Sequence, residues 1–188
     1  MNSEFLFVPE HLYHRRRDIH ARFGGQEQGG MITPADHKLV FLVTGSSGRQ
    51  HGYEDHWSED GSTFFYFGEG QTGDMKFTKG NLALRDHVLH GEDVHLFEEV
   101  PTKRGFLRYR GQMVCTGFAL VDAPDTQQNV RKATQSRNLC ASFISCCQDT
   151  EAKRCREYFC RLRQSVLGPC VHKPAYLREC LPGGLLPA

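Results

Sequence analysis

The sequence lacks a long apolar run, a paired set of metal ligands and a strong net charge. No stretch of about 18 apolar residues occurs, so we expect no transmembrane helix. At the N-terminus a short apolar stretch precedes the basic cluster, whereas a secretory signal has the opposite order. We therefore expect a cytoplasmic protein, associated with the nucleoid if it is bacterial.

The net charge of +1 argues mildly against nucleic-acid binding, because such domains are often strongly basic. The basic residues nevertheless cluster, first as Arg15-Arg16-Arg17 and later around Arg108 and Arg110. Clusters of this kind can create a local positive face on a nearly neutral protein. A plain solvated surface is the alternative for each of them.

Cysteine divides the chain into two zones. Only Cys115 precedes residue 139, and seven cysteines follow it without any C-x-x-C pair. Structural zinc is weakly supported because short paired spacings are missing, and the odd number argues against a disulfide framework. Residues 139–188 also carry a net charge of +3. We predict a DNA-binding domain over 8–137 and a Cys-rich basic tail over 138–188 that is irregular and poorly ordered.

The body of the chain predicts an α+β fold made mostly of strands. A short helix is expected to begin at Pro9, with Leu12, Ile19 and Phe23 at near-helical spacing, and to end at Gly24. A second helix is expected over residues 80–90. Its apolar side would hold Leu82, Leu84, Val88 and Leu89, and Gly91 would stop it.

Strands are predicted over residues 38–44, 63–67, 93–99, 105–110 and 112–121. In residues 105–110 we expect Phe106 and Arg108 on one face and Leu107 and Tyr109 on the other. Short strands separated by Gly and Pro suggest a small closed or half-closed barrel. Since the sequence turns polar at residues 134–137, we expect the closing strand to be missing and an edge to be exposed.

The segment from Gly52 to Met75 carries the clearest chemical signal. Tyr53 and Tyr66 flank an acidic turn that holds Asp55, and a glycine-rich loop over 68–73 follows. Two aromatic faces, a carboxylate and a flexible backbone can hold one flat polar ring, such as a flipped nucleobase. The alternatives are core aromatics, an ordinary turn aspartate and a plain hairpin loop. The loop is no Walker motif, because no Gly-Lys-Ser/Thr follows.

These residues also carry a family resemblance. The blocks Phe23–Gly30, Gly52–Asp55, Phe65–Gly70 and Asn81–Leu84, in this order, resemble the SRA or YDG domain. The version with F-G-G-Q-x-Q-G-G is most similar to bacterial SRA-like domains that are joined to HNH endonucleases in modification-dependent restriction. The resemblance implies a PUA-like twisted β-barrel with short flanking helices.

The same resemblance implies that the domain binds duplex DNA and flips out a modified cytosine, 5-methylcytosine or 5-hydroxymethylcytosine. Tyr53 and Tyr66 would sandwich the base, and Asp55 would accept hydrogen bonds from its exocyclic amine. Backbone groups at Phe67, Gly68 and Gly70 would complete the pocket. The turn is one residue longer than in eukaryotic readers, which leaves Glu54 and His56 as alternatives to Asp55.

For contacts to the DNA backbone we expect five basic side chains: Arg15, Arg16, His20, Arg108 and Arg110. No catalytic residue, metal site or cofactor is expected in this chain, and cleavage would come from a separate nuclease domain or subunit. A metal pair of His87 and His90 is improbable without a third ligand.

Three other functions stay open. An HNH-type endonuclease subunit would need a metal site, for which His51, Asp55, His56 and Asp60 are the candidates. A PUA-like RNA or small-ligand binder would use the same aromatic cage for another ring. A non-functional remnant would account for the unusual tail.

Overall fold

The computed structural model describes residues 7–45 and 54–140. The strands are β1 (Leu12–His14), β2 (Met31–Ile32), β3 (Leu39–Thr44), β4 (His56–Trp57), β5 (Thr63–Phe67), β6 (Asp93–Glu99), β7 (Phe106–Pro124) and β8 (Val130–Cys140). The helical segments are η1 (Arg15–His20, a π-helix), α1 (Ala21–Phe23) and α2 (Lys79–His90). In these ranges no helix has the length and apolarity needed to cross a bilayer.

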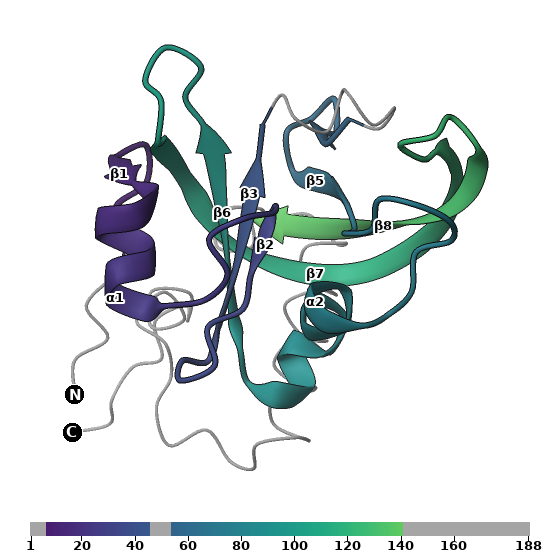
Figure 1. The fold of residues 1–188 in the computed structure, drawn as a ribbon. Coiled ribbons are helices and arrows are strands. Elements are labelled where there is room, and N and C mark those ends of the chain that lie inside the picture. Colours follow the sequence, from purple (N-terminus) through teal and green to yellow (C-terminus); the bar gives the residue numbers. More distant parts are fainter. Residues whose placement is uncertain (1–6, 46–53, 141–188) are drawn as a thin grey trace, which may run out of the picture.

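The strands form one curved sheet (Figure 1). Its order is β2-β3-β6-β7-β8-β5-β4, and β1 adds to β7 beside this path. β3 and β6 pair in parallel, and the other neighbours are antiparallel. The α+β class is confirmed. In the described residues β2 and β4 stay at the two ends of the path, so the sheet is open rather than a closed barrel.

One long strand replaces the two predicted over 105–110 and 112–121. β7 crosses the molecule in Figure 1, and its first half pairs with β6 while its second half pairs with β8. Register shifts make Arg110 and Thr116 the extra residues of two bulges. Gly111 does not end the strand. It supports the first bulge with a φ of 140°, a value that side chains rarely adopt.

The N-terminal helix begins later than predicted. Residues 12–14 form a strand because they pair with residues 106–108 of β7, and only at Arg15 does the chain turn into a helix. The Asp18 carboxylate accepts from the backbone N–H of His14 at 2.7 Å, while the His14 ring accepts from the N–H of Arg17 at 3.3 Å. This reciprocal capping fixes the start of the helix. Its predicted end is confirmed, since Gly24 follows with a φ of 74°.

The predicted absence of a strand after Ala133 is wrong. β8 continues to Cys140, three residues into the segment assigned to the tail, and pairs with both β5 and β7. Two of its buried polar side chains donate hydrogen bonds to β5: Ser136 Oγ donates to the carbonyl of Tyr66 at 3.1 Å. Asn138 Nδ2 donates to the carbonyl of Phe64 at 3.2 Å. The polar sequence therefore belongs to a core strand. Residues 141–188 lie outside the described ranges.

The helix over residues 79–90 ends as predicted at Gly91, which has a left-handed φ of 64°. Its buried side differs from the prediction. Leu89 is 54% exposed, whereas Asn81, Leu84 and His87 are buried. Both ring nitrogens of His87 have partners inside the protein: Nδ1 lies 3.0 Å from the carbonyl of Glu92, and Nε2 accepts from the N–H of Cys115. A polar residue whose partners are all inside the protein is buried like an apolar one.

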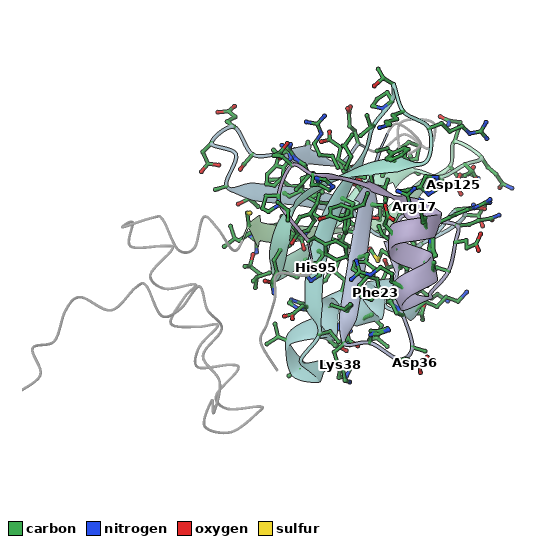
Figure 2. All side chains as sticks on the ribbon, turned by 90° about the vertical axis from the view of Figure 1, so that its left-hand side faces the viewer. Arg17, Phe23, Asp36, Lys38, His95 and Asp125 are labelled. Atoms are coloured by element: carbon green, nitrogen blue, oxygen red, sulfur yellow. The ribbon has the colours of Figure 1, made fainter. Side chains whose placement is uncertain are left out.

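β3 is buried on both faces, which explains its unbroken apolar sequence. Leu39, Phe41 and Val43 join an aromatic cluster under η1 and α1. Val40 and Leu42 face a second cluster that includes Leu84 of α2. Figure 2 shows Phe23 and His95 within this packed region, whereas Asp36 and Lys38 lie at the exposed turn before β3. The end of this rigid strand positions the candidate site.

Candidate functional site

Asp55 lies between the end of β3 and the end of β5. Its Oδ2 accepts a hydrogen bond from the Thr44 hydroxyl at 2.8 Å, and its Oδ1 accepts from the backbone N–H of Phe67 at 2.8 Å. Burial raises the pKa of Asp55 to about 6, although both hydrogen bonds oppose the rise. Each carboxylate oxygen has a second lone pair, so a ligand amine can still be accepted.

Tyr66 is a core side chain in this structure. It points inward from β5 together with Phe64 and is only 4% exposed. Its hydroxyl lies against Gly30, where an added Cβ would be 2.4 Å away. The other predicted half of the aromatic sandwich, Tyr53, lies outside the described residues, as does His51. The aromatic sandwich of Tyr53 and Tyr66 therefore stays a prediction.

Arg15 belongs to the interior side of the site rather than to an open helix face. Its Nη2 donates to the carbonyl of Gly29 at 2.7 Å, and its Nε donates to His20 Nε2 at 3.3 Å. Burial lowers the pKa of Arg15, and the nearby Glu99 and Tyr66 oppose this shift. His20 Nδ1 lies 3.3 Å from the carbonyl of Gly24. A ring that accepts through Nε2 must therefore donate there through Nδ1.

The other predicted DNA-backbone residues lie at the surface and have acidic neighbours. Arg16 has an 80% exposed side chain, with Glu27 at 3.6 Å. Arg108 and Arg110 share the outer face of β7, and both reach Glu10, at 3.4 and 2.8 Å. Leu107 and Tyr109 are buried on the opposite face, which confirms the predicted alternation. Exposed ion pairs contribute little, so phosphates could replace these carboxylates.

The glycine-rich loop after β5 is fastened to the protein. The N–H of Gly68 donates to the carbonyl of Thr134 at 2.8 Å, and a Cβ on Gly68 would lie 2.1 Å from the Thr134 hydroxyl. Asn81 accepts from the N–H of Glu69 at 2.8 Å and donates back to the carbonyl of the same residue at 2.9 Å. Gly70, with a φ of 148°, packs on Met75. In this structure the predicted backbone donors at Phe67 and Gly68 have internal partners.

The described candidate metal ligands, Asp55, His56 and Asp60, form no metal-binding group. His56 stacks on Phe65 with ring centroids 4.9 Å apart. Asp60 accepts hydrogen bonds from Ser58 and Ser62, which hold its pKa near 2. Across 7–45 and 54–140, no three His, Cys, Asp or Glu side chains are grouped so that they could hold a metal ion.

Two residues of the site are not predicted from the sequence: Thr44 and Gly30. Thr44 is the one polar residue in the strand sequence LVFLVT, and its position at the strand end is the signal that could have marked it. Gly30 gave no such signal, because the space it leaves is filled by Tyr66, a residue far away in sequence. Both lie near the end of β3, because Thr44 is its last residue and the carbonyl of Gly30 accepts from the N–H of Val43.

Comparisons with known proteins give one family and one fold. The sequence model of a family described as the ScoMcrA-like SRA domain matches residues 9–137. The structure of ScoMcrA, described as a type IV phosphorothioation-dependent restriction endonuclease, aligns at 20% identity with a TM-score of 0.57. That alignment covers 71% of this chain and 28% of ScoMcrA. A comparison with the curated proteins finds no match.

Two further structures share the fold. The sulfur-binding and SRA domains of ScoMcrA, complexed with phosphorothioated DNA, align at 20% identity and a TM-score of 0.56. The alignment covers 71% of this chain and 39% of that one. The DNA recognition domain of LpnPI, a cytosine modification-dependent restriction endonuclease, aligns at 16% identity and a TM-score of 0.53 over 70% of this chain and 72% of that one.

Proposed function

Because the chain belongs to the ScoMcrA-like SRA domain family, we propose that it recognises modified cytosine in duplex DNA by flipping the base. The modified base would be 5-methylcytosine or 5-hydroxymethylcytosine. The chain would act as the reader module of a modification-dependent restriction system. Cleavage would be the task of a separate nuclease domain or subunit.

The position of Asp55 carries this proposal. A cytosine-reading site needs an acceptor for the N4 amine, and a carboxylate is the expected partner. Asp55 is a half-buried carboxylate within the family motif, held from two sides by Thr44 and Phe67. Burial strengthens a hydrogen bond to it, because little water competes. Glu54 and His56 are both exposed, which favours Asp55 among the three candidates.

Base stacking would require a rearrangement around Tyr66. Its ring is packed in the core, so a base could reach it only if neighbouring side chains moved. We propose that the segment bearing Tyr53 provides the opposite face of the base. Of the five side chains predicted to contact the DNA backbone, Arg16 is the most accessible, and we propose that it fixes the register of the domain without reading sequence.

The decisive experiment is a fluorescence-anisotropy titration of the full chain at fixed salt. The duplexes would carry cytosine, 5-methylcytosine or 5-hydroxymethylcytosine at one position, and a fourth would carry an unmodified base next to a phosphorothioate linkage. A preference for one modified base supports the proposal. Equal binding to all four duplexes contradicts it, and a preference for the phosphorothioate alone would assign recognition to the DNA backbone. 2-Aminopurine beside the modified base reports flipping, because its fluorescence rises when it is unstacked.

Matched variants separate the site from general DNA binding. Asp55→Ala should abolish the preference and leave weak nonspecific binding. Asp60→Ala, on the exposed acidic turn, should keep the preference. Thermal unfolding of both variants confirms that they are folded. An Asp55→Ala protein that is folded and still discriminates would remove Asp55 from the pocket.

A further inference from the structure

Thr44 links the rigid sheet to Asp55, the half-buried carboxylate of the candidate site. The residue ends β3, and its backbone pairs with Glu98 of β6. The preceding residue, Val43, donates its N–H to the carbonyl of Gly30 at 2.6 Å. Thr44 is β-branched and has few χ1 choices on a strand. Its hydroxyl is therefore a fixed donor, 2.8 Å from Asp55 Oδ2.

The surroundings of Asp55 make the Thr44 hydroxyl important for the protonation state of the carboxylate. β3 presents the Thr44 hydroxyl and β5 presents the N–H of Phe67, and neither group titrates near neutral pH. Among the described residues, the charged groups that act on Asp55 are its two neighbours in sequence: His56 favours the ionised carboxylate and Glu54 disfavours it. Burial is the largest influence and favours the protonated acid. Two hydrogen bonds thus oppose the protonation of a carboxylate that is poised close to physiological pH.

We propose that Thr44 is a positioning residue, whose hydroxyl orients the Asp55 carboxylate, keeps it ionised and thereby sets the lower pH limit of modified-base recognition. The inference rests on the proposed function. Only the ionised carboxylate offers acceptor lone pairs on both oxygens; the protonated acid turns one of them into a donor. A hydroxyl that bonds to the charged form lowers the pKa of that group. Without Thr44, the carboxylate should be protonated up to a higher pH.

The test uses Thr44→Val, which keeps the shape of the side chain and removes the donor. The ratio of affinities for modified and unmodified duplexes is measured from pH 5.5 to 8.5 at constant ionic strength. This ratio cancels the general strengthening of DNA binding when histidines gain charge at low pH. In the wild type, the ratio should fall below a midpoint near pH 6, where Asp55 titrates. In Thr44→Val the midpoint should rise by about one pH unit, and the preference should recover at pH 8.5.

Two control variants show whether the midpoint depends on the Thr44 hydroxyl itself or on any change in a strand. Thr44→Ser keeps a hydroxyl and should restore the wild-type midpoint. Thr116→Val removes another strand hydroxyl, one that donates to the carbonyl of Arg137 at 3.2 Å, and should leave the midpoint unchanged. If Thr44→Val is folded and keeps the wild-type midpoint, the proposal is wrong while the proposed function stands. If the wild type shows no preference, the proposed function itself fails.

A DNA-free measurement keeps the proposal falsifiable on its own. Carboxyl ¹³C NMR follows the titration of Asp55 directly in the wild type, Thr44→Val and Thr44→Ala. A higher pKa of Asp55 in every variant that folds supports the positioning role. An unchanged pKa in a folded variant overturns it, whatever the DNA titrations give.

Discussion

The two glycine-rich segments of the chain, residues 24–30 and 68–73, look alike in sequence and differ in what they do. The first borders the candidate site: Gly29 offers its carbonyl to Arg15, and Gly30 leaves room for the Tyr66 hydroxyl. The second is bound to the rest of the fold. Asn81 of α2 forms two hydrogen bonds with the backbone of Glu69 in this second segment. Asp125, before β8, accepts from the N–H of Gly73 at 3.2 Å.

The difference shows that a glycine can be required by close packing as well as by the space that a ligand needs. From sequence the second segment looked like the flexible rim of a pocket. In the structure, Gly68 is where the loop, α2 and β8 meet too closely for a side chain. The first segment is where backbone and tyrosine meet, next to the carboxylate that we assign to recognition. One segment is therefore expected to govern stability and the other to affect binding.

Gly68→Ala should give the largest loss of stability. Its Cβ would lie 2.1 Å from Thr134 Oγ1 and 2.6 Å from Asn81 Oδ1, and both neighbours are buried. Such overpacking, together with the disturbed Asn81 hydrogen bonds, should lower the free energy of unfolding by about 3 kcal/mol or more. Urea unfolding followed by circular dichroism measures this. Gly73→Ala is the control: its φ of 64° is strained but nothing lies within 4 Å, so about 1 kcal/mol is expected. Equal effects of the two substitutions would refute the packing role of Gly68.

Asp55→Asn should change stability in the opposite direction. The native pKa of about 6 lies above the ordinary value of 3.8, so the ionised carboxylate destabilises the folded state. This penalty is absent below about pH 4, grows as pH rises through 6 and is complete near pH 7. An amide of the same shape escapes it and can still bond to Thr44 and Phe67. We expect the variant to gain up to about 3 kcal/mol at pH 7 and almost nothing at pH 4. Urea unfolding at both pH values decides; a gain independent of pH would show that Asp55 does not titrate as proposed.

Gly30→Ala should have a moderate effect that depends on Tyr66. The added methyl group would lie 2.4 Å from the Tyr66 hydroxyl, so the ring must shift, at a cost of about 1–2 kcal/mol. In a Tyr66→Phe background the nearest atom is gone, and the same substitution should cost about 1 kcal/mol less. A double-mutant cycle by thermal or urea unfolding measures this coupling. Strict additivity would show that the first glycine segment does not support Tyr66.

The smallest effect is expected at the surface beside the first segment. If Arg16 contacts a phosphate, Arg16→Gln should reduce the slope of log affinity against log salt by about 0.9. Arg15→Gln should leave the slope nearly unchanged but weaken the preference for modified DNA, because Arg15 is held inside by Gly29 and His20. Anisotropy titrations between 50 and 200 mM salt separate the two roles. A reduced slope for Arg15→Gln would place its guanidinium on the DNA instead.

Local signals predicted much of the fold. β3, β5 and β6 follow their apolar runs, and α2 ends at Gly91, because these features depend on neighbouring residues only. β1 and β8 were missed for a tertiary reason. Three residues before η1 become a strand only because β7 lies beside them. Ser136 and Asn138 can enter a core strand only because the carbonyls of β5 accept their hydrogen bonds.

The sequence points to the chemistry that we propose for the site, but it gives no sign of the contacts that hold Asp55. The motif identified Asp55 and Tyr66 as residues of interest, and the basic cluster identified Arg15. The motif could not show that Asp55 is held by Thr44, since the two lie 11 residues apart and meet only through the sheet. Nor could it distinguish a glycine beside open space from one packed against other residues. That difference depends on which side chains, distant in sequence, the fold brings next to the glycine.

The length of β7 has a consequence for folding during synthesis on the ribosome. This strand receives Glu10 from 100 residues earlier in the chain, and β5 must wait for β8, with Tyr66 and Ser136 70 residues apart. Chains dominated by such distant pairs fold slowly, on the scale of milliseconds to seconds. At a synthesis rate of about 5–20 residues per second, the N-terminal segment has no partner for roughly 5–20 s. During the first part of that interval the apolar β3 also lacks its partner β6, and we expect the nascent chain to be a client for chaperones.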